Sequence, residues 1–323
     1  MLAYAGIEPW HYGLFIVGVL IALAIDLGVF NREAHRVSFK EASCWTMVWF
    51  SLAMLFAFTA VPVRDGDAEP RMDFIAGYIL ELSLSMDNVF VIALVFTYFK
   101  VENKYQHRVL FWGIMGALIM RGIMIGIGAA AVSQFKEILI LFGAFLFFTG
   151  IKLLFTDDDG VEPDQNPLVR LARRFFPVAD NYDGQKFITR VNGRRMLTPL
   201  AIVLIAIEWT DVIFAVDSIP AIFVVTTDPF IVFTSNMFAI LGLRSLYFVL
   251  ANAIDYFHYL RYGLAFVLVF IGAKMLLERA GDFERLKAWS VHIPTFTSLL
   301  IVLGILVLSI VASLVRKARQ PRD

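Results

Sequence analysis

The stretch "LSLSMDNVFVIALVF", residues 82–96, is apolar enough to lie in a lipid bilayer, yet it carries an aspartate and an asparagine at its centre. About 20 residues of this character form one membrane-spanning helix, because a helix rises about 1.5 Å per residue across roughly 30 Å of hydrocarbon. A carboxylate at that depth is costly, so it marks a functional site by default. Asp87 and Asn88 therefore raise two questions, how many such helices the chain has and what the acid binds.

The composition of the whole chain is that of a membrane protein. Of the 323 residues, 59% are hydrophobic and 17% are charged, whereas a soluble domain of this length needs more polar surface. The 28 basic and 28 acidic residues cancel, and no basic tract is long enough to follow a phosphate backbone, so we expect no nucleic-acid binding. The single cysteine, Cys44, excludes an internal disulfide and a CxxC motif.

Apolar stretches long enough to cross the membrane predict nine helices and an all-α polytopic fold, with 1–323 as a single transmembrane domain. The expected spans lie near residues 12–30, 42–61, 74–99, 109–132, 137–155, 197–225, 231–250, 262–277 and 295–315. The loops on one side of these spans hold 18 Lys and Arg residues and those on the other side hold six. Since cytoplasmic loops carry the excess of positive charge, the N-terminus is predicted outside and the C-terminus in the cytoplasm.

The longest connection, residues 156–196, is expected to be a cytoplasmic loop with some structure of its own. Its segment "PLVRLARRFF" predicts a short helix at the membrane surface, with arginines near the anionic leaflet. Its segment "KFITRVNGRRML" predicts a hairpin that turns at Asn192-Gly193.

The chain also contains an internal repeat. "LELSLSMDNVFVI" (80–92) aligns with "TDVIFAVDSIPAI" (210–222), and each copy has an acid, five residues, an aspartate and a small polar residue. The aligned polar pairs in the two copies are Glu81 with Asp211, Asp87 with Asp217, Asn88 with Ser218, Arg121 with Arg244, and Lys152 with Lys274. Gly150 likewise aligns with Gly272.

Because the two copies enter the membrane from opposite sides, we expect an inverted repeat of three-helix units, spans 3–5 and 6–8. Such repeats are typical of secondary transporters, which bind substrate near the bilayer midplane where the repeats meet. The predicted parts are two N-terminal helices (1–73), repeat 1 (74–155), the cytoplasmic loop (156–196), repeat 2 (197–278) and a C-terminal helix (295–315).

The polar residues of the motifs predict a cation site. Carboxylate, amide and hydroxyl oxygens are hard ligands, suited to Mg, Ca or Mn. Pro220 is expected to break its helix near Val216 and to offer carbonyl oxygens beside Asp217. Met86 either adds a soft thioether, which favours Mn, or only packs. The predicted metal ligands are Glu81, Asp87, Asn88, Asp211, Asp217 and Ser218.

Four further residues are candidates for proton coupling or gating. Glu208 lies one turn before Asp211 on the same helix face, and repulsion between the two carboxylates is expected to raise the pKa of Glu208. A raised pKa suits this residue to exchange a proton. Asp26 either guards the inner vestibule or caps backbone donors. Arg121 and Arg244 either neutralise the acids when the site is empty or serve as structural counter-ions.

The motifs also resemble a known family. "AIDLGVFNREAHRVSFKEA" (24–42), "ELSLSMDNVFV" (81–91) and "EWTDVIFAVDSIPAIFVVTTDPFIVFTSNMFAILGLRSLYF" (208–248) are similar to the TerC family of bacterial membrane proteins, and within it to the Alx-type members. The acidic motifs show no departure from the family pattern, whereas the cytoplasmic loop and the C-terminal tail cannot be matched.

The resemblance implies an inner-membrane protein linked to manganese efflux, with older labels of tellurium resistance and redox modulation. We therefore expect a non-enzymatic exporter of Mn2+ that exchanges it for protons and holds no cofactor; its partners are the lipid bilayer and the divalent cation. The alternative left open is a non-transporting protein of metal homeostasis or redox stress, which hands metal to secreted proteins or organises other membrane proteins.

Overall fold

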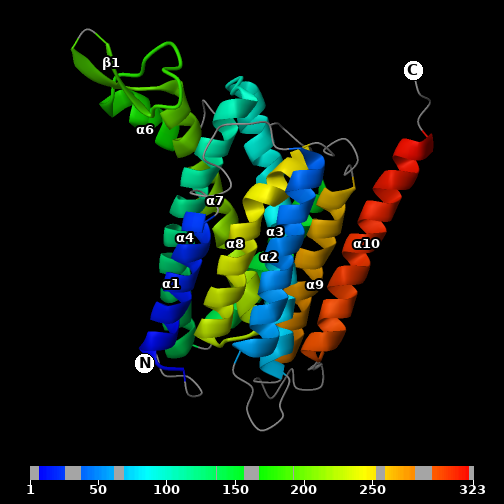
Figure 1. Cartoon of the computed structure of the whole chain (residues 1–323). Helices are drawn as coiled ribbons and strands as arrows, with labels where there is room; N and C mark the ends of the chain where they lie inside the picture. The colour runs from blue at the N-terminus through cyan, green and yellow to red at the C-terminus, as the bar shows by residue number, and fades with distance from the viewer. Residues whose placement is uncertain are drawn as a thin grey trace.

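Figure 1 shows the computed structural model of the chain, which describes residues 7–25, 38–61, 69–135, 137–155, 167–191, 193–251, 259–280 and 293–319. Ten helices and one two-stranded hairpin make up these described parts. In chain order they are α1 (Pro9–Ile25), α2 (Phe39–Thr59), α3 (Glu69–Tyr98), α4 (Asn103–Gln134), α5 (Ile138–Phe155), α6 (Pro167–Phe175), β1 (Ile188–Val191), β2 (Arg194–Leu197), α7 (Pro199–Val225), α8 (Pro229–Ala251), α9 (Leu260–Ala280) and α10 (Thr295–Arg319).

All the long helices run side by side as one bundle, as expected of a polytopic membrane protein (Figure 1). Within the described ranges, seven of them are long and apolar enough to cross a membrane, and α1 is a shorter apolar helix. The all-α polytopic fold is thus confirmed, while the number of nine spans stays a prediction. Helix α1 begins at the end of the bundle opposite the hairpin, and α10 ends on the hairpin's side (Figure 1).

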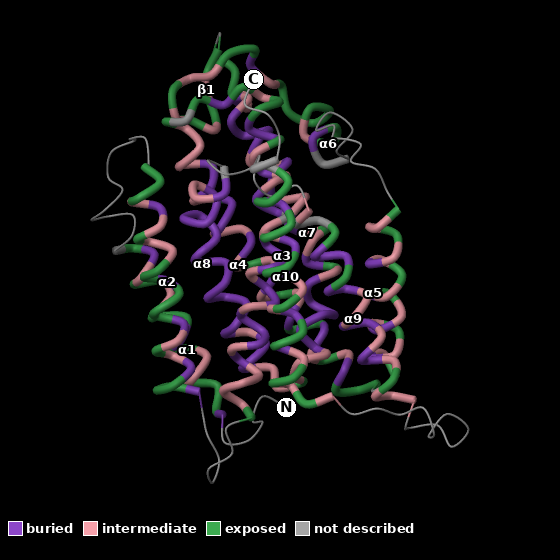
Figure 2. Tube along the Cα trace, turned by 90° about the vertical axis from the view of Figure 1, so that its right-hand side faces the viewer, coloured by how far each residue is buried: buried purple, intermediate pink, exposed green. Residues whose placement is uncertain are grey.

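The centre of the bundle is formed by α3, α7 and α8. Buried residues follow α8 along almost its whole length, and the outer helices α2 and α10 expose much of their surface (Figure 2). The outward-facing side chains are large and apolar, for example Leu14, Phe148 and Leu308 at 64%, 68% and 70% exposure. Such a surface is stable against lipid rather than water, so the bundle's outer face is the membrane-facing one.

Helix pairs pack in a pattern that is relevant to the expected repeat. Helix α3 packs on α8, α4 packs on α7, and α5 packs on α9. At the α5–α9 contact, a Cβ added to Gly150 would lie 2.7 Å from the backbone nitrogen of Val269, and one added to Gly272 would lie 2.5 Å from that of Phe147. The two aligned glycines thus allow the same close approach of backbones. The inverted relation of the two halves itself stays a prediction.

The loop between the halves has the structure that its sequence predicts. Residues Pro167–Phe175 form the short helix α6, and β1 pairs with β2 in an antiparallel hairpin whose turn includes Gly193 at φ +78°. The Tyr182 hydroxyl donates to the Phe99 carbonyl at 2.7 Å. Thr198 caps α7 by accepting from the Ala201 backbone N–H. The hairpin is therefore fixed to the ends of α3 and α7.

One local expectation is wrong. Helix α7 runs without a break from Pro199 to Val225 and contains Pro220 inside it. Proline removes one helical hydrogen bond, but its neighbours Ile219, Ala221 and Ile222 are all buried at 4% exposure or less, and their packing holds the helix together. Carbonyl ligands beside Asp217 from an unwound α7 are therefore not part of the site.

Candidate cation site

The buried charges of the bundle meet at Arg121. This side chain, from the middle of α4, is 0% exposed. Its Nη1 forms an ion pair with Oε1 of Glu81 on α3, and its Nη2 lies 2.9 Å from Oδ1 of Asp211 on α7. Since Glu81 and Asp211 are the aligned first acids of the two motifs, the structure brings equivalent positions of the two motifs onto one guanidinium.

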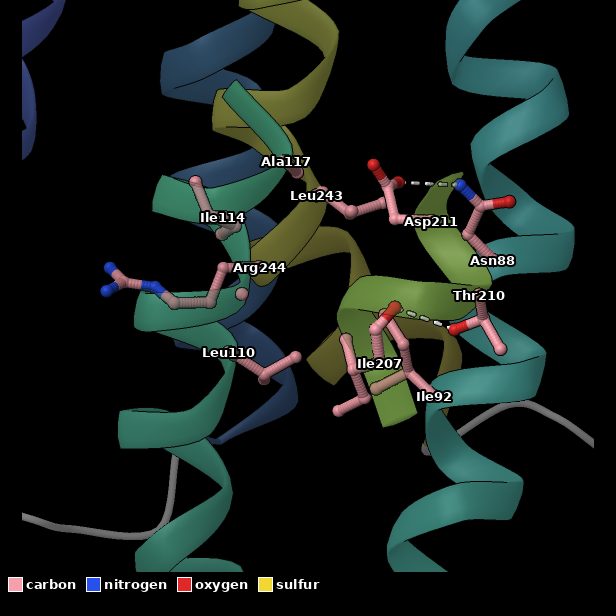
Figure 3. A pocket seen from close by; sticks show the side chains of 11 residues that line it. Asn88, Ile92, Leu110, Ile114, Ala117, Ile207, Thr210, Asp211, Leu243 and Arg244 are labelled. Carbon is pink, nitrogen blue, oxygen red and sulfur yellow. Dashed lines mark hydrogen bonds between the residues drawn. The ribbon is translucent and has the colours of Figure 1, made fainter. Parts of the chain in front are cut away.

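Asn88, the residue after Asp87 on α3, also belongs to this cluster. Its Nδ2 donates to Asp211 Oδ1 at 3.4 Å, and Ser85 Oγ donates to Glu81 Oε1 at 3.3 Å. An ionised carboxylate only accepts hydrogen bonds, so the Asn88 NH2 group must face Asp211. The amide oxygen of Asn88 consequently points away from Asp211, as Figure 3 shows.

A cavity of about 90 Å3 lies beside the cluster. Its size is that of roughly three water molecules at about 30 Å3 each, or of one ion with part of its hydration shell. Leucines of α3, α5 and α9 and Phe214 of α7 form its apolar wall. The polar and charged residues that line it are Glu81, Asn88, Arg121, Thr149, Asp217 and Ser218.

Three of these lining residues present a buried oxygen that has no hydrogen-bond partner in the described part of the chain. The atoms are Glu81 Oε2, Asn88 Oδ1 and Ser218 Oγ. A buried acceptor without a partner costs free energy of about 1–3 kcal/mol. Carboxylate, amide and hydroxyl oxygens are the hard ligands that Mg, Ca and Mn prefer, so their chemistry suits a cation as the partner.

Asn88 also lines a second, smaller cavity of about 20 Å3, whose lining residues are drawn in Figure 3. It is lined by Asp211 and Thr210 of α7 and by Arg244 of α8. The guanidinium of Arg244 points away from Asp211 and lines a further cavity with Glu41 and His107. Arg121 and Arg244 are aligned in sequence but have different surroundings, since Arg121 pairs with two motif acids and Arg244 lies between two cavities.

The remaining predicted residues are placed as follows. Glu208 lies half-buried on α7, and its carboxylate occupies the space that a side chain at Gly116 of α4 would need. Asp87 lies within α3, but its side chain is outside the described residues, as is the whole of Asp26. The expected sharing of one ion between Asp87 and Asp217 therefore stays a prediction.

Thr149 is the polar lining residue that the predicted site did not include. It comes from α5, directly before Gly150, and a lone hydroxyl in that apolar span was the available signal. Over the described ranges, no group of three or more His, Cys, Asp or Glu side chains is arranged to hold a metal ion. A cation in this cavity would accordingly depend on mixed ligands, with amide and hydroxyl oxygens beside the carboxylates.

Both motif helices fall within a match to a known family. Residues 67–321, from before α3 to the end of α10, match the family described as "Integral membrane protein TerC family". The chain belongs to the TerC family. This membership places the Glu81, Arg121 and Asp211 cluster inside the TerC region, whereas α1 and α2 precede it.

Relatives match nearly the whole TerC chain. "Uncharacterized membrane protein STKORF319" of Myxococcus xanthus is 49% identical over 97% of this chain and 95% of its own length. The protein named "Putative membrane-bound redox modulator Alx" of Escherichia coli (strain K12) is 48% identical over 94% of each chain. An "Uncharacterized membrane protein" of Rickettsia felis is 36% identical over 94% of this chain and 97% of its own. No solved structure matches.

Proposed function

We propose that this TerC protein transports a divalent cation, Mn2+, out of the cytoplasm in exchange for protons, and that it catalyses no chemical conversion. The observation that carries the proposal is the cavity beside Arg121, in which Glu81 Oε2, Asn88 Oδ1 and Ser218 Oγ are buried without partners. A site that binds no cation would leave three costly oxygens at the centre of the bundle.

The charges at the cavity favour a divalent cation. Glu81 and Asp217 line the cavity, and Arg121, which also lines it, pairs with Glu81 and with Asp211. With all four groups ionised, the cluster carries two negative charges in excess. A divalent ion neutralises that excess, and so do two protons, which is the balance that an exchange of one cation for protons requires.

Alternating access has a structural counterpart around Asn88. This residue lines both the larger cavity and the smaller cavity that holds Asp211 and Arg244. Under the proposal, small movements of α3 against α7 open one side at a time, as in transporters with inverted repeats. Glu208, one turn from Asp211, is the group we assign to carry a proton when the cation leaves.

We assign Mn2+ as the transported cation for two reasons. The oxygen ligands disfavour soft metals, and the resemblance to the TerC family implies manganese. Met86 contributes little to this choice, because it packs against two apolar clusters of the bundle rather than lining the cavity. We place the protein in the bacterial inner membrane with its N-terminus outside, following the distribution of Lys and Arg.

Reconstitution in liposomes tests the proposal. Purified protein is tested for flux of Mn, Mg, Ca and Zn ions with and without an imposed pH gradient. We expect Mn2+ flux that increases when the gradient drives protons in the opposite direction, and that acidifies the Mn2+-donating side. Flux equal to that of protein-free liposomes for every cation would refute transport.

A second function is suggested by the name of the E. coli relative, a membrane-bound redox modulator. A non-transporting protein of redox stress, metal homeostasis or metal delivery to secreted proteins would co-purify with partner proteins and would carry no ion flux by itself. A redox role through a bound chromophore would give visible absorbance in the purified protein. The liposome assay separates these cases from transport.

A further inference from the structure

Helix α6 has an unusual surface for a short helix at the edge of the bundle. Its nine residues contain three arginines, Arg170, Arg173 and Arg174, all exposed, and no acidic residue. Beside them, Leu171 and Phe175 are 50% and 69% exposed. Exposed cations and exposed large apolar side chains thus occur together on one turn and a half of helix.

The order of these residues around the helix separates them into three faces. Val169 is completely buried and packs against α7. At about 100° per residue, the arginines lie within roughly 40–140° of Val169 on one side, and Leu171 and Phe175 lie roughly 120–160° away on the other. One face is fixed to the bundle, one is apolar and open, and one is cationic. This is the arrangement of helices that lie in the membrane interface.

The adjoining hairpin continues the cationic surface. Arg190 of β1 lies directly opposite Arg195 of β2 in the antiparallel register, and Ile188 on the same strand face is 58% exposed. Like charges in such cross-strand positions repel and destabilise the pair unless an anion lies between or beside them. The cationic residues of α6 and the hairpin, here called the basic surface, are Arg170, Arg173, Arg174, Lys186, Arg190, Arg194 and Arg195, all exposed.

The basic surface is held at the end of the bundle rather than on a loose tether. Tyr182 bonds to the end of α3, and Arg108 Nη1 of α4 donates to Gln185 Oε1 at 3.4 Å. Helix α6 and the hairpin lie together at the end of the bundle where α10 ends (Figure 1). A polytopic bundle presents its helix ends to the lipid headgroups, so the surface lies at headgroup level.

We propose that the basic surface docks on anionic phospholipid headgroups, with Leu171 and Phe175 inserted at the boundary between headgroups and acyl chains. Anionic lipid supplies both partners that the surface needs, phosphate for the cations and hydrocarbon for the apolar stripe. Free phosphate or nucleic acid supplies phosphate for the cations but no hydrocarbon for the apolar stripe. This docking is independent of the proposed transport.

The test uses the full chain in lipid nanodiscs. Phe175 is changed to cysteine on a Cys44→Ser background, so that a fluorescent bimane label has one attachment site. Nanodiscs contain phosphatidylcholine with or without phosphatidylglycerol, plus a phosphatidylcholine that carries a nitroxide quencher near its carbonyl groups. We expect phosphatidylglycerol to increase quenching, because it increases the ratio of docked to undocked α6.

Charge variants decide the cause of any quenching. In R170Q/R174Q the docked-to-undocked ratio in phosphatidylglycerol should fall roughly 25-fold, since each arginine near an anionic surface contributes about fivefold. The matched control K40Q/K100Q removes two exposed cations outside the basic surface and should change nothing. Added inorganic phosphate should not reproduce the effect of the lipid. Equal quenching in both lipids, equal behaviour of the two charge variants, or no quenching at all would overturn the proposal.

Discussion

Replacing Arg121 with glutamine tests whether the central charge cluster holds the bundle together. The side chain is 0% exposed and pairs with Glu81 and Asp211, so R121Q leaves two buried carboxylates without their ion-pair partner. Removing one partner of a buried pair typically costs about 3–5 kcal/mol, because the remaining charge is uncompensated. We expect a loss of that size in the free energy of unfolding of R121Q.

The measurement is unfolding in mixed detergent micelles by a denaturing detergent, followed by helical circular dichroism. The control is K104Q, which removes an exposed ion pair between Lys104 and Glu102 and should change the free energy of unfolding little, because water screens exposed pairs. The double variant E81Q/R121Q should recover part of the loss, with a coupling energy on the order of 0.5–3 kcal/mol. If R121Q lay within about 1 kcal/mol of K104Q, or if the effects of E81Q and R121Q were additive, the ion pairs of Arg121 would not be what holds the bundle together.

Three further predictions concern packing, pH and ligand binding. Changing Gly272 to alanine should destabilise the fold by about 1–3 kcal/mol, because the new Cβ would lie 2.5 Å from a backbone nitrogen of α5. The control Gly304→Ala should be nearly neutral, because no atom lies within 4 Å of the Cβ that it adds. Hydrogen bonds from a threonine hydroxyl and a lysine ammonium hold the pKa of Asp183 below its usual 3.8. The ionised carboxylate therefore stabilises the hairpin above pH 3.8, and this stabilisation is lost as the pH falls through the lowered pKa. Hydrogen exchange of the hairpin amides should show the loss, and D183N should remove this pH dependence. Mn2+ at about 100 times its Kd should raise the free energy of unfolding by about 2.7 kcal/mol, and EDTA should reverse the gain; a D217N variant that responds as the wild type does would remove Asp217 from the site.

The parts of the fold that could be predicted from sequence are those with local causes. Apolar length predicted the helices, and the Asn192-Gly193 pair predicted the hairpin, since a turn with φ above zero needs such residues. Helix α6 was predicted from the short segment "PLVRLARRFF", which combines arginines with apolar residues. In each case a few neighbouring residues determine the outcome.

The site was predictable in its residue types but not in its pairing. The motifs named Glu81 and Asp211, but no spacing along one helix shows that both acids reach the same arginine on a third helix. The break at Pro220 was predicted from local chemistry, and the packing around Ile219 and Ile222 overrides it. Rotation of each helix about its own axis decides such contacts, and it is set by the packing of the whole bundle.

Uptake of 54Mn2+ into inverted membrane vesicles decides whether the protein exports Mn2+, because uptake there corresponds to export from the cell. Asp217 lines the larger cavity, beside Arg121, so D217N should reduce uptake to the level of vesicles without the protein. The same chemical change beside the hairpin, D183N, should leave uptake at the wild-type level. A D217N protein that is folded in the membrane and transports Mn2+ as fast as D183N would contradict the account.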